Sequence, residues 1–148
     1  MAAKLFGGDV SEAKRFYEEV RSNDLDTQWV TYRYEGNTLE LGGNGENLDD
    51  LFSKTEENFN DNDRVYAYVR FETGDEMSRR AKFAFITWIG PAVSVLKKGK
   101  VSTDKAFVKQ VFVEFGKEFL CDTRSELSQS KMLKDLEKAS GAAYGTGR

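Results

Sequence analysis

The sequence predicts an α/β (α+β) fold in which helices flank both faces of a central, five-stranded mixed β-sheet. The length of 148 residues suits one compact domain, and 39% hydrophobic with 13% aromatic residues can fill one core. The predicted elements follow in the order helix, hairpin, helix, strand pair, long helix, strand and helix. This alternation is typical of a mixed sheet held between two helical layers.

The first predicted helix begins at Asp9 or Ser11, either of which can cap it, and ends at Asn23. Glu12 stands in its first turn, where an acidic side chain is favourable. Its apolar residues recur at helical spacing and therefore share one face: Val10, Ala13, Phe16, Tyr17 and Val20. We expect this face to pack toward the core.

A β-hairpin follows the first helix. Residues 28–34 combine alternation with aromatic bulk, which predicts a strand, and a turn centred on Gly36 returns the chain over residues 38–41. We expect the glycine-rich residues 42–45 to break this pattern and form a loop. Residues 47–55 have apolar side chains at helical spacing and predict a short helix.

The second half of the chain begins with two strong strands, predicted over residues 64–72 and 81–89. The second strand is nearly continuously apolar, as expected of a central strand covered on both faces. Helical spacing returns from Ser94 to about Gly116, and because Gly99 disfavours a helix, the helix starts either near Ser94 or only at Ser102. A short strand over residues 118–121 should pair in parallel through a right-handed crossover. A final amphipathic helix is predicted over residues 127–139.

The two ends of the chain frame one domain, predicted over residues 9–140. Residues 1–8 form an N-terminal lead, and residues 141–148, with three glycines, predict a flexible tail. The N-terminus lacks the basic and apolar pattern of a secretory signal, and the longest apolar run, Phe83–Ile89, is too short to span a bilayer. With a single cysteine, Cys121, these features predict a cytoplasmic protein, and we expect a monomer.

The absence of histidine narrows the chemistry that this chain can perform. With no His and one Cys, the sequence excludes His-containing zinc sites, Cys₄ sites, catalytic triads and any internal disulfide. Few other groups titrate near neutral pH, so we expect neither an enzyme nor a metal or other cofactor. Cys121 is expected to serve as a small buried hydrophobe.

Charge is distributed unevenly along the chain. The formal net charge is −3, so the protein is not a polycation suited to nucleic acid. Residues 40–63 hold eight acids against one Lys, whereas residues 76–110 hold eight bases against two acids, a local charge of +6. Either the basic segment faces an acidic partner, or the two segments are ordinary solvated faces.

Two groups of cations within the basic segment are candidates for a binding surface. Lys98, Lys105 and Lys109 are spaced by seven and four residues, which places them on one stripe of the long predicted helix. The other group begins the central strand, from where its side chains can reach the same edge of the molecule. It consists of Arg79, Arg80 and Lys82.

The most specific pattern in the chain is VRFETGDEMSRRAKF at residues 69–83, followed by ITWIG at residues 86–90. Shorter matches include WVT at residues 29–31, TDK at residues 103–105 and KASGAAY at residues 138–144. Over almost the whole chain, from Val10 to Tyr144, the sequence resembles the coactosin-like branch of the actin-depolymerising-factor homology (ADF/cofilin-like) superfamily. The resemblance implies one mixed five-stranded sheet flanked by helices.

The resemblance also implies a function. Its members bind the sides of actin filaments (F-actin) and modulate filament dynamics with little severing, as cytoplasmic components of the actin cytoskeleton. Two basic elements carry filament binding in the family, namely the turn into the central strand and the Lys-bearing face of the long helix. They match Lys82, with Arg79 and Arg80 beside it, and Lys109, with Lys105 one turn earlier.

The sequence departs from the family pattern in places, and there we do not expect this chain to share the family's properties. Cofilins carry a phosphorylatable Ser after the first Met, whereas residues 2–6 here are Ala, Ala, Lys, Leu and Phe. The long helix opens with residues 96–100, Leu-Lys-Lys-Gly-Lys, in place of an apolar Met-containing segment, so only weak binding to actin monomers (G-actin) is expected. An alternative function is a basic-patch adaptor for anionic lipid headgroups or another acidic protein.

Overall fold

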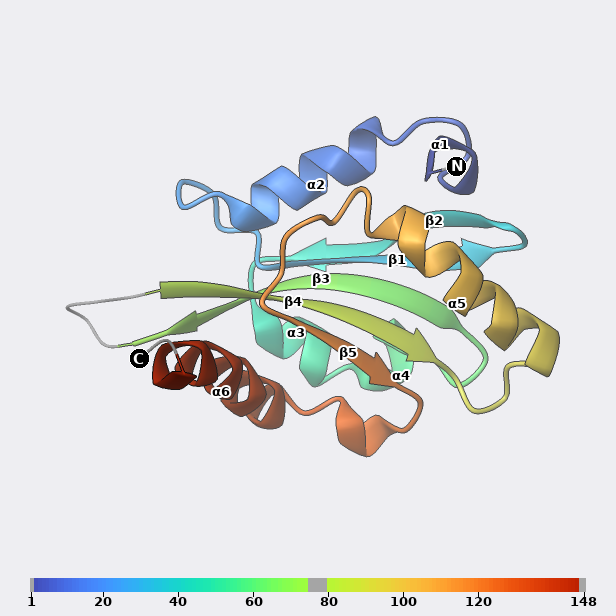
Figure 1. Ribbon diagram of the computed structural model, residues 1–148. Coiled ribbons are helices and arrows are strands. Elements are labelled where there is room, and N and C mark those ends of the chain that lie inside the picture. Colours follow the sequence, from blue (N-terminus) through green and yellow to red (C-terminus); the bar gives the residue numbers. More distant parts are fainter. Residues whose placement is uncertain (1, 75–79, 147–148) are drawn as a thin grey trace.

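The computed structural model describes residues 2–74 and 80–146, with side chains up to residue 139. A five-stranded sheet in the order β2-β1-β3-β4-β5 forms its centre (Figure 1). The strands are β1 (Trp29–Glu35), β2 (Thr38–Gly45), β3 (Arg64–Thr73), β4 (Arg80–Ile89) and β5 (Lys117–Cys121). The pair β4–β5 is parallel and the others are antiparallel, so the predicted mixed sheet is confirmed.

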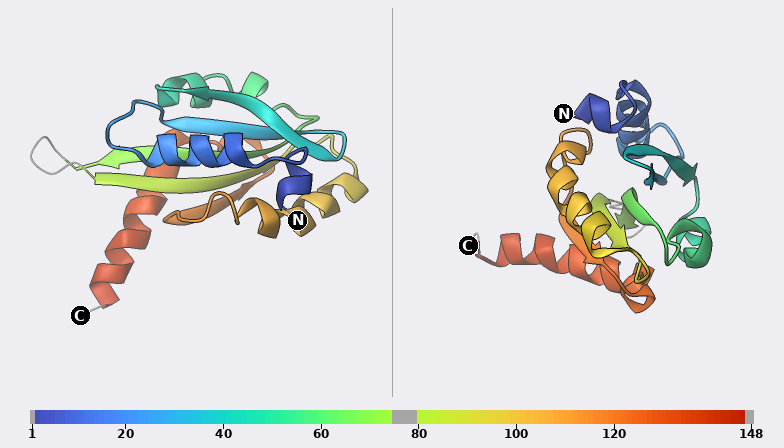
Figure 2. Two further views of the ribbon diagram at one scale, coloured as in Figure 1. Left: turned by 90° about the horizontal axis from the view of Figure 1, so that it is seen from above. Right: turned by 90° about the vertical axis from the view of Figure 1, so that its right-hand side faces the viewer.

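Helices cover both faces of the sheet, as predicted. On one face lie α2 (Ser11–Arg21) and α5 (Val95–Val108), and on the other lie α3 (Leu48–Phe52), α4 (Thr55–Asn58) and α6 (Gln129–Thr146) (Figures 1 and 2). Two short elements complete the chain: α1 (Ala2–Leu5) near α5, and the 3₁₀ helix η1 (Arg124–Glu126) before α6. In Figure 2 the C-terminal part of α6 points away from the sheet.

The core therefore has two layers that share the sheet. Beneath α2 and α5, tyrosines of β1 and β3 pack with Phe85 and Phe112, whereas the opposite layer is built around Trp29, Trp88 and Phe71. In the centre of β4, Ala84, Phe85, Ile86 and Trp88 are all fully buried, which confirms that this strand is covered on both sides. The predicted apolar face of α2 is likewise buried.

The prediction of a loop at residues 42–45 is wrong, because β2 continues to Gly45 and pairs with β1 on both sides of an irregularity at Gly42. The glycines are needed where side chains of β1 lie across the neighbouring strand. A Cβ on Gly42 would lie 2.7 Å from Thr31 Oγ1, and one on Gly45 would lie 2.8 Å from Trp29 Nε1. Glycine thus makes room for Trp29 at this position and does not end the strand.

The long helix is shorter than predicted. Ser94 caps α5 by accepting a hydrogen bond from the Lys97 N–H, but the helix ends at Val108 and does not extend to Gly116. The chain then turns so that the Gly116 N–H donates to Phe83 O, at 2.7 Å, and leads into β5. After Val108 the apolar residues keep helical spacing, but the chain leaves the helix because residues 116–121 pair with β4 instead.

Both chain ends contain helix. Residues 2–5 of the predicted lead are helical, with Leu5 buried and the Phe6 ring edge-on to Tyr32 at 5.2 Å. Helix α6 continues to Thr146, so residues 141–146 of the predicted tail are helical, in keeping with the high helix propensity of their alanines. Residues 147–148 lie outside the described part, and the domain boundary at residue 140 stays a prediction.

Candidate binding surface

The two predicted basic elements are linked through the segment that leads from α5 into β5. The hydrogen bond from Gly116 N–H to Phe83 O ties this segment to the start of β4, next to Lys82. Ala84 then pairs with Lys117 in the parallel register. The start of β4 is thus joined to the link that follows α5.

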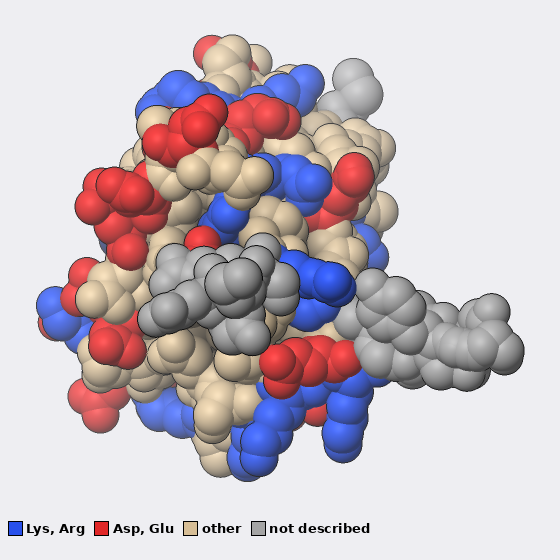
Figure 3. Space-filling model, turned by 90° about the vertical axis from the view of Figure 1, so that its left-hand side faces the viewer, with Lys and Arg blue, Asp and Glu red and all other residues tan. Residues whose placement is uncertain are grey.

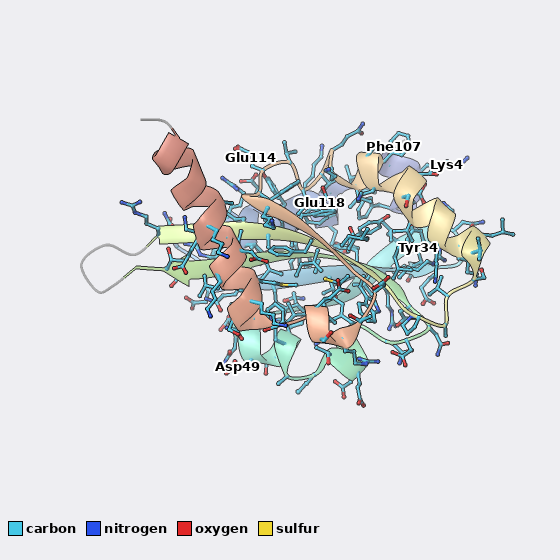
Figure 4. The ribbon with its side chains drawn as sticks, turned by 60° about the horizontal axis from the view of Figure 1, so that its bottom comes forward. Lys4, Tyr34, Asp49, Phe107, Glu114 and Glu118 are labelled. Atoms are coloured by element: carbon cyan, nitrogen blue, oxygen red, sulfur yellow. The ribbon has the colours of Figure 1, made fainter. Side chains whose placement is uncertain are left out.

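On α5, Lys105 and Lys109 lie on one stripe, as predicted, and both contact a single acid on β5. Lys105 Nζ lies 2.7 Å from Glu118 Oε2, and Lys109 Nζ lies 2.8 Å from Glu118 Oε1. Figure 4 shows Glu118 on β5, beside α5. Three charged groups in this cluster therefore sum to +1, half of what the two lysines would present alone.

The electrostatics of Glu118 follow from these contacts. Partial burial raises the pKa of the Glu118 carboxyl, but hydrogen bonds from Lys105 and Lys109 and their positive charges outweigh it, so the net pKa is lowered. Glu118 is therefore an anion at neutral pH and remains paired with both ammonium groups. The sequence analysis did not identify this acid, because it lies on a different element from the lysines.

Lys98 is not part of this cluster. It lies seven residues before Lys105, or about 10 Å along the helix axis, and its side chain is exposed. The neighbouring Lys100 forms an ion pair with Asp104 at 2.6 Å, and Asp104 also accepts a hydrogen bond from the Tyr34 hydroxyl at 2.8 Å. The stripe is thus divided into the exposed Lys98 and the Glu118 cluster, and Lys100 beside it is paired within the helix.

At the start of β4, Arg80 is exposed and Lys82 is half-buried, and both interact with neighbouring groups. Arg80 stands opposite Thr73 and Lys82 opposite Phe71 in the β3–β4 pair. Figure 3, which views this end of the molecule, shows cationic side chains interspersed with acidic ones. Arg79, also predicted as a site residue, lies outside the described residues.

A hollow of about 270 Å³ lies between the start of β4 and the α5–β5 link, and Lys82 forms part of its wall. The other described lining residues come from four segments: Arg21, Ala81, Phe83, Glu114, Phe115, Gly116 and Leu136. Figure 4 shows Glu114 in the link between α5 and β5. Arg21, at the end of α2, is the cation of this group that the sequence analysis missed.

Arg21 is held by contacts that no local pattern predicts. Its Nη1 donates to the Tyr68 hydroxyl at 3.1 Å and to Glu114 O at 3.3 Å, and its guanidinium carbon lies 4.6 Å from the centre of the Phe83 ring. A basic residue in the last turn of a helix is common, because it offsets the helix dipole. Only the tertiary fold brings it to the hollow that Lys82 also lines.

Elsewhere, the described residues contain no cluster of acids or Cys arranged to hold a metal ion, and no described helix is long and apolar enough to cross a bilayer. Cys121 is buried, and this burial raises the pKa of its thiol to about 12. Its predicted role as a small hydrophobe is confirmed by its place in the core layer that contains Trp88.

Comparisons with known proteins agree on one family. Residues 8–137 match the family of cofilin/tropomyosin-type actin-binding proteins. Coactosin-like protein from Bos taurus is 41% identical over 144 residues, covering 97% of this chain and 96% of that protein. The crystal structure of human coactosin-like protein superposes with a TM-score of 0.79 at 39% identity, covering 88% of this chain and 96% of the other. The solution structure of mouse coactosin, described as an actin filament binding protein, has a TM-score of 0.72 at 40% identity, over 94% and 95% of the two chains.

Proposed function

Because this chain belongs to the family of cofilin/tropomyosin-type actin-binding proteins, we propose that it binds the sides of actin filaments. The binding surface comprises the start of β4 and the C-terminal half of α5. Lys82 and Lys109 are its principal residues, with Arg80 and Lys105 beside them. Arg79 and Lys98 extend it along the sequence.

The observation that supports this proposal is the link that joins the two basic elements. Lys82 and Lys109 are far apart in the sequence, yet the α5–β5 link ties β4 to the end of α5 through Gly116. A surface with an excess of cations suits an acidic partner, and complementary charge mainly raises the association rate and fixes the orientation. The names of the relatives point to actin as that partner and favour it over an anionic lipid or another acidic protein.

We further propose that binding is the whole activity and that no catalysis accompanies it. The chain has no His, and the thiol of Cys121 is buried with a pKa of about 12, so neither supplies a general base or a nucleophile at neutral pH. The protein would modulate filament dynamics in the cytoplasmic actin cytoskeleton simply by occupying filament sides.

Co-sedimentation with polymerised actin tests this function. The protein should pellet with filaments at low salt and progressively less as salt rises, because exposed charge pairs are screened over ~8–10 Å at ordinary ionic strength. Lys14→Ala, on the exposed face of α2, is the matched control and should pellet like the wild type. Absence of the protein from the pellet at low salt would contradict the proposal.

A further inference from the structure

We propose that the hollow between Arg21 and Lys82 is a carboxylate-binding site that receives an Asp or Glu side chain of the filament. The inference rests on the proposed function and adds to it a residue and a chemical group. Arg21 and Lys82 belong to different elements, α2 and β4, and line the same hollow of about 270 Å³. That volume is several times the ~30 Å³ that one water occupies, so it can hold a carboxylate side chain.

The hydrogen-bonding capacity of Arg21 supports a carboxylate ligand. Both hydrogen bonds of the Arg21 side chain within the described residues use Nη1, which donates to the Tyr68 hydroxyl and to Glu114 O. Within the described residues, Nε and Nη2 have no acceptor, and no carboxylate lies within ion-pair distance of the guanidinium. A guanidinium with two neighbouring N–H donors available matches the two oxygens of a carboxylate.

The Arg21 side chain is also held in place before any partner arrives. Its guanidinium lies over the Phe83 ring at 4.6 Å and near the Tyr17 ring at 5.6 Å, and Nη1 is fixed by its two hydrogen bonds. Because these contacts already restrict its rotamers, little side-chain entropy remains to be lost on binding. An exposed lysine on α5 has no comparable restraint.

The remaining walls strengthen the attraction for an anion. Phe83, Phe115 and Leu136 provide apolar surface, which lowers the local dielectric constant and so increases the attraction between opposite charges. Lys82 supplies a second positive charge from β4. Glu114 lies at the rim with an exposed side chain; its backbone oxygen accepts a hydrogen bond from Arg21, and its carboxylate, beyond ion-pair distance, attracts the guanidinium only through longer-range charge.

The test is a double-mutant cycle measured by co-sedimentation with actin filaments. Arg21→Met and Lys82→Met remove each charge but retain most of the hydrocarbon stem. Each should weaken binding about fivefold, and the double variant should be little weaker than the stronger single variant, because both cations contact one carboxylate. In the matched cycle, Arg21→Met with Lys109→Met, the two losses should multiply, since Lys109 lies in the separate Glu118 cluster.

Melting temperatures are measured alongside, because Arg21 also holds Tyr68. If Arg21→Met lowers the melting temperature, Arg21→Lys is used in its place. This variant keeps the positive charge but loses the two neighbouring N–H donors. Its affinity for filaments should lie between that of the wild type and that of Lys82→Met. Wild-type binding by Arg21→Met or Arg21→Lys would overturn the inference while leaving the proposed function intact. Fully multiplicative losses for Arg21 and Lys82 would also overturn it, since they indicate separate contacts. Absence of wild-type binding would overturn both.

Discussion

The end of α5 and the hollow beside β4 present positive charge in different ways. At the end of α5, Lys105 and Lys109 share Glu118, so much of their charge is compensated within the protein. In the hollow, Arg21 lies on an aromatic ring and is held by neutral oxygens, with no acid paired to it in the described residues. The number of cations on a surface therefore does not measure the attraction that it offers to a partner. The distribution of compensating acids decides it.

The largest effect is expected at the hollow. Lys82→Ala should weaken filament binding about tenfold, or ~1.4 kcal/mol, because a charge lost inside a contact costs more than one lost at a rim. Co-sedimentation at several protein concentrations gives the affinity, and a melting curve checks the fold. A binding curve identical to that of the wild type would show that Lys82 only flanks the strand.

Lys109→Ala should have a smaller effect, about threefold, because Glu118 already offsets part of the charge that this lysine presents. The matched control is Lys98→Ala on the same helix, which lies outside the Glu118 cluster and should change binding less than Lys109→Ala. Both are measured in the same pelleting assay. A loss for Lys109→Ala equal to that for Lys82→Ala would remove the distinction between the two regions.

Glu118→Gln should act in the opposite direction and tighten binding about twofold. Partly exposed ion pairs contribute only ~0–1 kcal/mol, so losing them costs little positioning, whereas an anion is removed from a surface that faces an acidic filament. The salt dependence of binding should also become steeper. Weaker binding by this variant, at unchanged melting temperature, would show instead that Glu118 positions the two lysines.

The smallest effect concerns stability and pH. The pKa of Glu118 is lower in the folded than in the unfolded protein, so its contribution to the free energy of unfolding is full above the unfolded pKa and is lost as pH falls through the folded value. Wild type should be slightly more stable than Glu118→Gln at pH 7, and their melting temperatures should converge in acid, below the ordinary pKa of Glu near 4.5. A constant difference from pH 7 to pH 3 would contradict this.

Much of the fold could be predicted because the deciding interactions are local. The apolar face of α2 and the continuous apolar run of β4 follow from side-chain spacing alone, and both are confirmed. Residues 42–45 were predicted as a loop, since four polar or small residues lack the alternation of a strand. Their strand depends on Trp29 lying across Gly45, which spacing does not show. The end of α5 was missed because the hydrogen bond from Gly116 to Phe83 competes with continued helix.

In the candidate binding surface, too, the features set by local spacing could be predicted and those set by tertiary contacts could not. The positions of Lys105 and Lys109 on one stripe follow from helix geometry, and their predicted role in binding stays a prediction. Glu118 and Arg21 could not be found from the sequence, because each meets its partners on a different element of the fold. The Tyr68 hydroxyl that holds Arg21, for example, comes from a strand 47 residues later.

Because Cys121 is buried, its rate of alkylation can serve as a built-in measure of local opening at the edge of the sheet. The residue stands opposite Trp88 on β4, at the end of the edge strand β5. With a pKa of about 12, only ~10⁻⁴ of the thiol is ionised at pH 8 even before its burial hinders a reagent. An alkylating reagent can therefore modify it at an appreciable rate only when the core layer around it opens, by movement of β5 or of α6. Because the chain has a single cysteine, the labelling rate reports that local opening directly, without an engineered probe.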